Sequence, residues 1–234
     1  MIKRAMFCFS LLAFAGVAAA QAPVTSTDAK WVEGKNYFRV EPQQPTSVAT
    51  GKIEVMEVFS YACPVCYRFL PYADKISKSL PPDAQMVYLP VSFNPAEDFP
   101  VFQRAFYAAQ ALGVEAKAHE AMFKAIHGPG GELATYDART GRMKNPLPGI
   151  KDIAQFYAQY GVKPEVFVAT ANSFAVNMKM KRADAEVQAL GVTGTPTMVV
   201  DGKWRYDMTS AGGPQQVVEL TDYLINLERQ AKKQ

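Results

Sequence analysis

Two cysteines, Cys63 and Cys66, stand two residues apart in the stretch VFSYACPVCYRF, which covers residues 58–69. The third cysteine of the chain, Cys8, lies in an apolar run near the N-terminus. Two thiols at this spacing can bind a metal ion, attach a haem, form a structural disulfide or exchange disulfides with other thiols. Each kind of chemistry requires different residues elsewhere in the chain.

The rest of the sequence disfavours three of these four. A zinc site needs four ligands, but His119 and His127 fall on predicted helices without paired spacing and are expected to be helix-surface or core residues rather than catalysts. A c-type haem needs a histidine where this chain has Tyr67. A passive disulfide over so short a ring would stabilise little. We predict a redox-active Cys63–Cys66 disulfide, no metal site and no other cofactor.

The residues around the cysteines predict how this dithiol is activated. Residues 53–59, IEVMEVF, are typical of a strand, and a helix is expected to follow, with Pro64 suited to its first position. Cys63 would then cap the helix N-terminus, where free amides and the helix dipole lower the pKa of a thiol. Cys66, one turn later, would face the interior. A stabilised Cys63 thiolate makes the disulfide an oxidant.

A later segment is expected to meet the dithiol. The stretch GVTGTPTMVV places Thr195-Pro196 directly before a strand, where a trans proline would spoil pairing, so we predict a cis Thr195-Pro196 bond. A strand, a CxxC motif and a helix, combined with a late cis-proline loop, form the thioredoxin arrangement, in which the proline loop abuts the dithiol.

The order of the remaining segments predicts an α/β protein with a helical insertion. A second strand is expected over 86–93, and helical patterns run from Phe99 to about residue 183. A β-hairpin across Asp201-Gly202 and a final helix near Pro214 then follow. We expect a thioredoxin fold interrupted by an inserted all-helical domain. The expected ranges are 21–98 and 184–234 for the thioredoxin-like domain and 99–183 for the insertion, with a Gly/Pro-rich surface loop at 128–149.

The N-terminal residues predict export. Lys3 and Arg4 precede an apolar run and then small residues, which is the layout of a signal peptide, with cleavage expected after Ala20 or Ala22. Cleavage after Ala20 would remove two positive charges and lower the formal net charge from +3 to +1, which gives no reason to expect nucleic acid as a partner. We therefore expect the mature protein to be soluble and to lie outside the cytoplasm.

Over nearly the whole mature chain the sequence resembles the DsbA family of thiol:disulfide interchange proteins. The resemblance rests on the leader, EVFSYACPVCYRF, the helical insertion from about Phe99, ALGVE, ANSF and GVTGTP. It implies the interrupted thioredoxin fold, a disulfide donated to newly secreted proteins with free thiols, and reoxidation by a quinone-linked membrane partner of the DsbB type.

The resemblance also implies roles for single residues. Cys63 matches the attacking nucleophile, Cys66 the resolving cysteine and Pro196 the cis-proline beside them. Glu57, six residues before Cys63, matches a buried acid under the dithiol. Alternation along the strand would place Glu57 on one apolar face with Val55 and Phe59, so we expect it to handle protons near Cys66.

This chain departs from the family pattern at three places. Family members often carry histidine where this chain has Val65, so its oxidising power is expected to be weaker, or Val65 contacts a peptide substrate. Thr195 precedes Pro196, where some relatives have an apolar residue, and its hydroxyl could bond a cysteine sulfur or a substrate backbone. The strand at 86–93 lacks a lysine to pair with Glu57, and Tyr88 is its nearest polar group.

Together these features favour a monomeric periplasmic oxidase. A disulfide isomerase or reductase is the alternative enzyme, but isomerases of this fold usually need a dimerisation domain, and the roughly 30 residues before the first strand leave no room for one. A chaperone-like peptide-binding protein, with an incidental dithiol, is the alternative outside enzymes.

Overall fold

A computed structural model describes residues 30–232, so the predicted signal peptide at 1–20 lies outside the described residues. The five strands of the described sheet have the order β1-β5-β4-β2-β3. They are β1 (Phe38–Arg39), β2 (Ile53–Phe59), β3 (Ala84–Pro90), β4 (Thr197–Val200) and β5 (Trp204–Tyr206). The helices are α1 (Pro64–Ser79), α2 (Phe99–Ala111), α3 (Glu115–His127), α4 (Ile150–Ala158), α5 (Pro164–Ala171), α6 (Phe174–Ala189), α7 (Met208–Ala211) and α8 (Pro214–Ala231), with a 3-10 turn, η1 (Pro95–Glu97).

Strand β2 carries the chain to the CxxC motif from the middle of the sheet. All seven of its residues are buried, and it pairs parallel to β3 and antiparallel to β4. The predicted bounds of β2 are confirmed, whereas β3 runs over 84–90 rather than 86–93. It ends early because β2 stops at Phe59, and the Val91 amide makes the last bond to that residue's carbonyl.

The predicted hairpin between β4 and β5 is confirmed. Asp201 and Gly202 both have left-handed backbones, as the tight turn requires. A Cβ atom at Gly202 would collide with the carbonyl oxygen of Gln44, so this position needs glycine for space as well as for conformation. The hairpin therefore fixes both β4 and the proline loop that precedes it.

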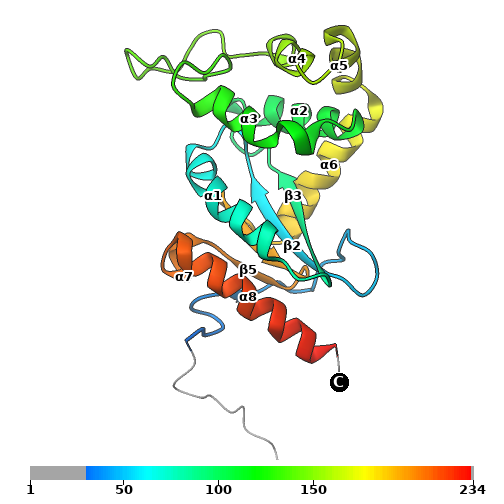
Figure 1. Cartoon of the computed structure of the whole chain (residues 1–234), viewed down its shortest axis with the longest axis vertical. Helices are drawn as coiled ribbons and strands as arrows, with labels where there is room; N and C mark the ends of the chain where they lie inside the picture. The colour runs from blue at the N-terminus through cyan, green and yellow to red at the C-terminus, as the bar shows by residue number, and fades with distance from the viewer. Residues whose placement is uncertain (1–29, 233–234) are drawn as a thin grey trace, which may run out of the picture. The chain divides into compact units, whose positions relative to one another are not determined.

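Helices α2 to α6 follow one another between β3 and β4, as the predicted insertion requires, and α2 to α5 gather at the end of the sheet where α1 begins (Figure 1). The expected boundary between residues 183 and 184 falls inside α6, which continues to Ala189 because Ala183 and Val187 extend its buried face. Residues 128–149 form an irregular loop with one bridge, between Tyr136 and Met143.

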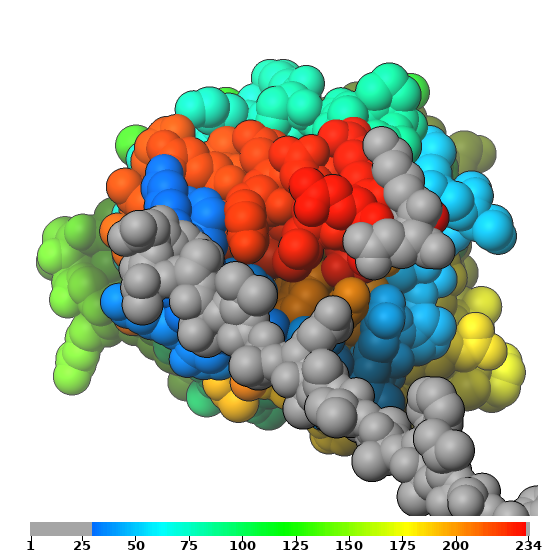
Figure 2. All heavy atoms as spheres, turned by 90° about the horizontal axis from the view of Figure 1, so that it is seen from below, coloured from blue at the N-terminus to red at the C-terminus, as the bar shows by residue number. Residues whose placement is uncertain are grey.

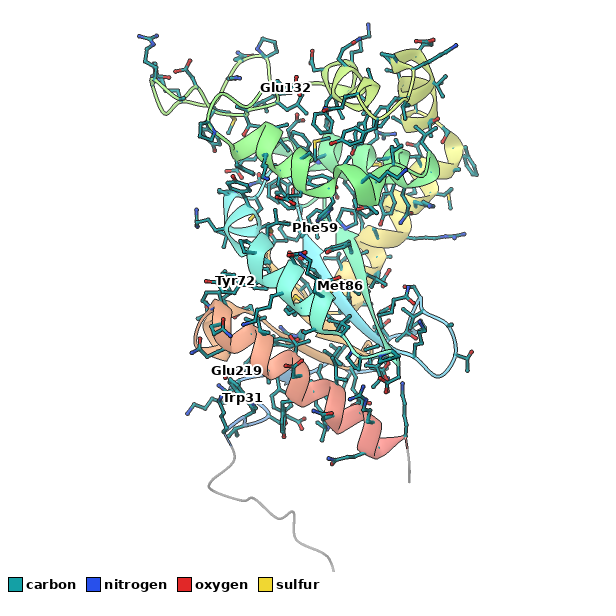
Figure 3. All side chains as sticks on the ribbon, viewed as in Figure 1. Trp31, Phe59, Tyr72, Met86, Glu132 and Glu219 are labelled. Carbon is teal, nitrogen blue, oxygen red and sulfur yellow. The ribbon has the colours of Figure 1, made fainter. Side chains whose placement is uncertain are left out.

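Helices α1 and α8 cover the face of the sheet on which Val55 lies. On this face, Val55 of β2 shares a cluster with Phe69 of α1 and Leu220 of α8. Helix α8 begins at Pro214 as predicted, and Figure 2 shows it beside the segment that follows residue 30. Phe59, at the end of β2, lies between the sheet and the helices above it (Figure 3). Its ring contacts Phe106 of α2 and the rings of α3.

Candidate active site

The two cysteines lie at the start of α1, just after the end of β2. Cys63 is the N-cap of α1, in an extended conformation, and Pro64 is the first helical residue, as predicted. The amide of Cys66 donates a hydrogen bond to Cys63 Sγ at 3.4 Å. An N-cap side chain ordinarily satisfies a free amide of the first turn, and here a sulfur atom does so.

This environment favours the thiolate of Cys63. A hydrogen bond from the Cys66 thiol lowers the pKa of Cys63 most, to about 6, with further help from the Thr195 hydroxyl and the amides of Val65 and Cys66, against the opposing effect of burial. A thiol with this pKa is largely ionised at neutral pH. Cys63 is therefore a nucleophile and a good leaving group.

Cys66 has the opposite properties. Its side chain has no exposed surface, whereas 6% of Cys63 remains exposed. Burial raises the pKa of Cys66 well above its usual range, and the charges of Cys63 and Glu57 raise it further. Both cysteines are free thiols, which is the reduced form of the pair. A reagent from solvent can reach Cys63 first.

The proline loop meets the dithiol as predicted. The Thr195-Pro196 bond is cis, and the Cys63 thiol donates to the main-chain carbonyl of Thr195 at 3.5 Å. Two further cis prolines, at Glu41-Pro42 and Asn145-Pro146, were not predicted. The half-buried side chain of Val65 lines a cavity of about 240 Å³ together with Thr195 and Pro196. Pro64 is exposed beside it.

Glu57 is buried beneath the pair, with 2% of its surface exposed. Alternation along β2 puts it on the face of Val55, which packs against α1, the helix that carries Cys66. Burial raises the pKa of Glu57 to about 8, and the Cys63 charge contributes. Tyr88 is its register partner on β3. At neutral pH the carboxyl therefore holds a proton close to an ionised Cys63.

Two histidines brace the turn before Cys63, a feature that the sequence did not reveal. Nδ1 of His119 lies 2.9 Å from the hydroxyl of Tyr61, and Nε2 of His127 lies 2.7 Å from the carbonyl oxygen of Tyr61. The ring of His127 also stacks on Tyr67 at 5.4 Å. Both histidines belong to α3, so the insertion fixes the segment that carries the dithiol. Their spacing of eight residues, which places both on one helix face, was the available signal.

Residues 30–232 contain neither a metal-binding cluster nor a membrane-spanning helix. No group of three or more His, Cys, Asp or Glu side chains there could hold a metal ion. No helix in the same range is long and apolar enough to cross a bilayer.

Comparison with known proteins gives one consistent family. The model of the DSBA-like thioredoxin domain matches residues 54–224. The thiol:disulfide interchange protein DsbA of Pseudomonas aeruginosa is 40% identical over 203 residues, which cover 87% of this chain and 88% of the relative. The protein of the same name from Burkholderia cepacia is 30% identical over 216 residues, or 92% and 93% of the two chains.

Solved structures agree with the sequence relatives. The crystal structure of DsbA from Pseudomonas aeruginosa is similar with a TM-score of 0.74 and 39% identity, covering 88% of this chain and 98% of that one. The oxidoreductase DsbA from Xylella fastidiosa is similar with a TM-score of 0.75 and 33% identity, covering 86% and 99%.

Proposed function

The chain belongs to the family of DSBA-like thioredoxin domains, and we propose that it is a thiol:disulfide oxidase that donates the Cys63–Cys66 disulfide to newly secreted proteins. The observation that carries the proposal is the contrast within the pair. Cys63 caps a helix with a pKa lowered to about 6, and Cys66 is buried with a raised pKa. Such a pair is more stable reduced than an ordinary dithiol, so its disulfide oxidises other thiols.

The reaction proceeds through a mixed disulfide. A client thiolate attacks Cys63 Sγ, the Cys63–Cys66 bond breaks, and Cys66 leaves as a thiolate that takes up a proton. A second client thiolate then attacks the client sulfur of the mixed disulfide and releases Cys63 as a thiolate. The client loses two electrons and gains a disulfide, and the pair ends as one thiolate and one thiol.

Glu57 is proposed as the proton donor in the first step. Its pKa of about 8 keeps it protonated at neutral pH, and it influences the ionisation of both cysteines. A leaving Cys66 thiolate with a strongly raised pKa would take this proton rather than remain ionised. Glu57 then recovers a proton from solvent before the next cycle.

The neighbouring residues are proposed to shape the reactive sulfur and the approach to it. Pro64 starts α1 without losing a hydrogen bond, and Thr195 contributes a hydroxyl and a carbonyl to the environment of Cys63. Pro196 and Val65 line the adjacent cavity, which supports the idea that Val65 touches a client peptide. Val65 carries no charge that could stabilise the Cys63 thiolate. The stabilisation must therefore come from the N-terminus of α1 and from the hydrogen bonds to the sulfur.

The setting of the enzyme is also proposed. The signal-peptide pattern of residues 1–20 and the similarity to proteins named DsbA support a periplasmic location. We further propose that the protein works as a monomer. Its disulfide would be restored by a quinone-linked membrane partner of the DsbB type. We take the helical insertion to begin at Phe99 and to end with α6, beyond the residue 183 first expected.

Trapping the mixed disulfide tests the proposal. A Cys66→Ala variant keeps Cys63 but cannot resolve the adduct, so it should accumulate a covalent complex when it is mixed with an unfolded client that carries a disulfide. A Cys63→Ala variant should form none, and the native protein should oxidise a reduced two-cysteine peptide. Equal adduct formation through Cys66 would contradict the assigned roles, and a Cys63→Ala variant that retains client function would favour the chaperone-like alternative.

A further inference from the structure

The cavity beside the proline loop contains a charged side chain that the reaction at sulfur does not use. Arg205 of β5 lines the cavity together with Val65, and Thr193 and Thr209 are also among its lining residues. The volume of about 240 Å³ is smaller than that of a typical small-molecule site and suits a single peptide side chain. A client cysteine bonded to Cys63 would bring its neighbouring residues to this cavity.

Arg205 is held in place before any ligand arrives. Its guanidinium carbon lies 5.5 Å from the centre of the Phe38 ring, which is its register partner on β1. A Cβ atom at Gly191 would lie 3.6 Å from its Nε atom, so the backbone of Gly191 approaches the guanidinium closely. A half-buried arginine that contacts groups from two other segments loses less conformational entropy on binding an anion than a free one.

The charge of Arg205 is not neutralised by the described part of the chain. Arg39, Lys203 and Arg229 pair with carboxylates, but none of the ion pairs within residues 30–232 involves Arg205. Asp207 is the other charged residue of the cavity wall. As the N-cap of α7, Asp207 accepts a hydrogen bond from the amide of Ser210 through its Oδ1 atom. One of its two carboxylate oxygens is therefore already hydrogen-bonded within the protein.

We propose that Arg205 makes this cavity a binding site for an acidic side chain of the client, an aspartate or glutamate close in sequence to the cysteine that forms the mixed disulfide. The carboxylate would accept hydrogen bonds from the guanidinium fork and from the hydroxyls beside it. The inference rests on the proposed function, because it concerns which thiols are oxidised first. Arg205 binds the client and takes no part in the exchange of sulfur.

A rate comparison tests the inference. In a Cys66→Ala protein with a chromophoric aromatic thiol in disulfide linkage to Cys63, an attacking peptide thiolate displaces the aromatic thiol, whose absorbance gives the rate. Each peptide has one cysteine and carries either glutamate or glutamine at one of the three positions on either side of it. The same peptides are then tested on the protein carrying Arg205→Gln, Arg205→Lys or Arg182→Gln. Arg182 is exposed on α6 outside the cavity.

The measured quantity is the glutamate-to-glutamine rate ratio, compared between proteins so that the intrinsic reactivity of each peptide cancels. At one position or more the ratio with Arg205 should exceed that with Arg205→Gln by about two- to fivefold, the range of a partly exposed ion pair. Arg205→Lys should keep part of the preference, Arg182→Gln all of it, and high salt should reduce it.

Two results would overturn the inference. A ratio that is the same with arginine and glutamine at position 205 would mean that the cavity does not select charge. In a further peptide series with lysine in place of glutamate, a lysine-to-glutamine rate ratio that is higher with Arg205 than with Arg205→Gln would mean that Arg205 does not set the charge preference of the cavity. Failure of every peptide to displace the aromatic thiol from Cys63 is a separate result, which would refute the proposed function itself.

Discussion

Sγ of Cys63 lies 3.5 Å from the main-chain carbonyl oxygen of Thr195, which is 132 residues further along the chain. The same sulfur accepts a hydrogen bond from the Cys66 amide at 3.4 Å. The carbonyl can hold the thiol and the amide can hold the thiolate, so the sulfur has a partner in either protonation state. The nucleophile is therefore fixed in position before a client arrives.

The pKa of Cys63 depends on its partner cysteine. The Cys66 thiol is the largest cause of the lowered pKa of about 6, so Cys66→Ala should raise that pKa, and Cys66→Ser, which keeps a donor, should raise it less. The pH dependence of alkylation of Cys63 in the two variants and in the reduced native protein measures this. Identical midpoints in all three proteins would show that the helix terminus alone sets the pKa.

Glu57 should destabilise the folded protein increasingly as the pH rises. Its folded pKa of about 8 lies above its ordinary value of 4.5, so the cost is absent below pH 4.5, grows between these values and levels off above pH 8. Glu57→Gln should therefore gain stability relative to the native protein over this range, by more than ~1 kcal/mol at pH 7. Denaturant unfolding of the reduced proteins at several pH values measures the difference.

The control for Glu57 is the exposed loop residue Glu132, whose replacement by glutamine should change the free energy of unfolding by less than about 0.5 kcal/mol, as is usual for surface substitutions. The same Glu57→Gln protein should also show an altered pH dependence of its redox equilibrium, because the charge of Glu57 interacts with the charges of both cysteines. A variant that follows the native protein at every pH would remove Glu57 from the proton path.

Val65→His should make the disulfide more oxidising. A positive charge or a donor at this position adds to the stabilisation of the Cys63 thiolate, and each unit by which the pKa falls corresponds to ~1.4 kcal/mol, or about 30 mV, wherever the thiolate is the populated form. Val65→Ala serves as the control, because it removes the apolar side chain without adding charge. If the reduction potential of the Val65→His variant equals that of the native protein, a histidine at this position does not stabilise the Cys63 thiolate further.

Removing the hydroxyl of Tyr61 should destabilise the turn before the dithiol. Tyr61→Phe breaks the buried bond to Nδ1 of His119 and should cost about 1–3 kcal/mol in the free energy of unfolding. The matched control is Tyr136→Phe, whose hydroxyl bonds Glu97 on the surface and should cost less. Equal costs would show that His119 does not brace this turn.

The local parts of the fold could be predicted from the sequence because nearby residues decide them. Pro64 and the cysteine before it mark the start of α1, and Asp201-Gly202 marks the hairpin turn. The end of α6 could not be placed, because it depends on Ala183 and Val187 being covered by segments far away in the chain. The end of β3 likewise depends on where its partner β2 stops.

In the site, too, features set by nearby residues could be predicted and contacts between distant segments could not. The nucleophile, the buried partner and the cis-proline follow from motifs, and burial of Glu57 followed from strand alternation. The contacts of His119 and His127 with Tyr61 could not be foreseen, because they require the packing of α3 on the turn before the motif. The position of Arg205 depends on Phe38, which lies far away in the chain on β1, and on Gly191, which lies before the proline loop.

The equilibrium of the Cys63–Cys66 pair with glutathione redox buffers, measured on protein without residues 1–20, tests the central claim most directly. At pH 7 the lowered pKa of Cys63 should favour the reduced state by ~1.4 kcal/mol relative to an ordinary thiol, an effect that is lost as the pH falls through about 6. The pair should remain reduced except in strongly oxidising buffer, with a reduction potential above about −200 mV. A potential below about −300 mV, typical of a structural disulfide, would contradict the oxidase function and favour a reductase or a structural role.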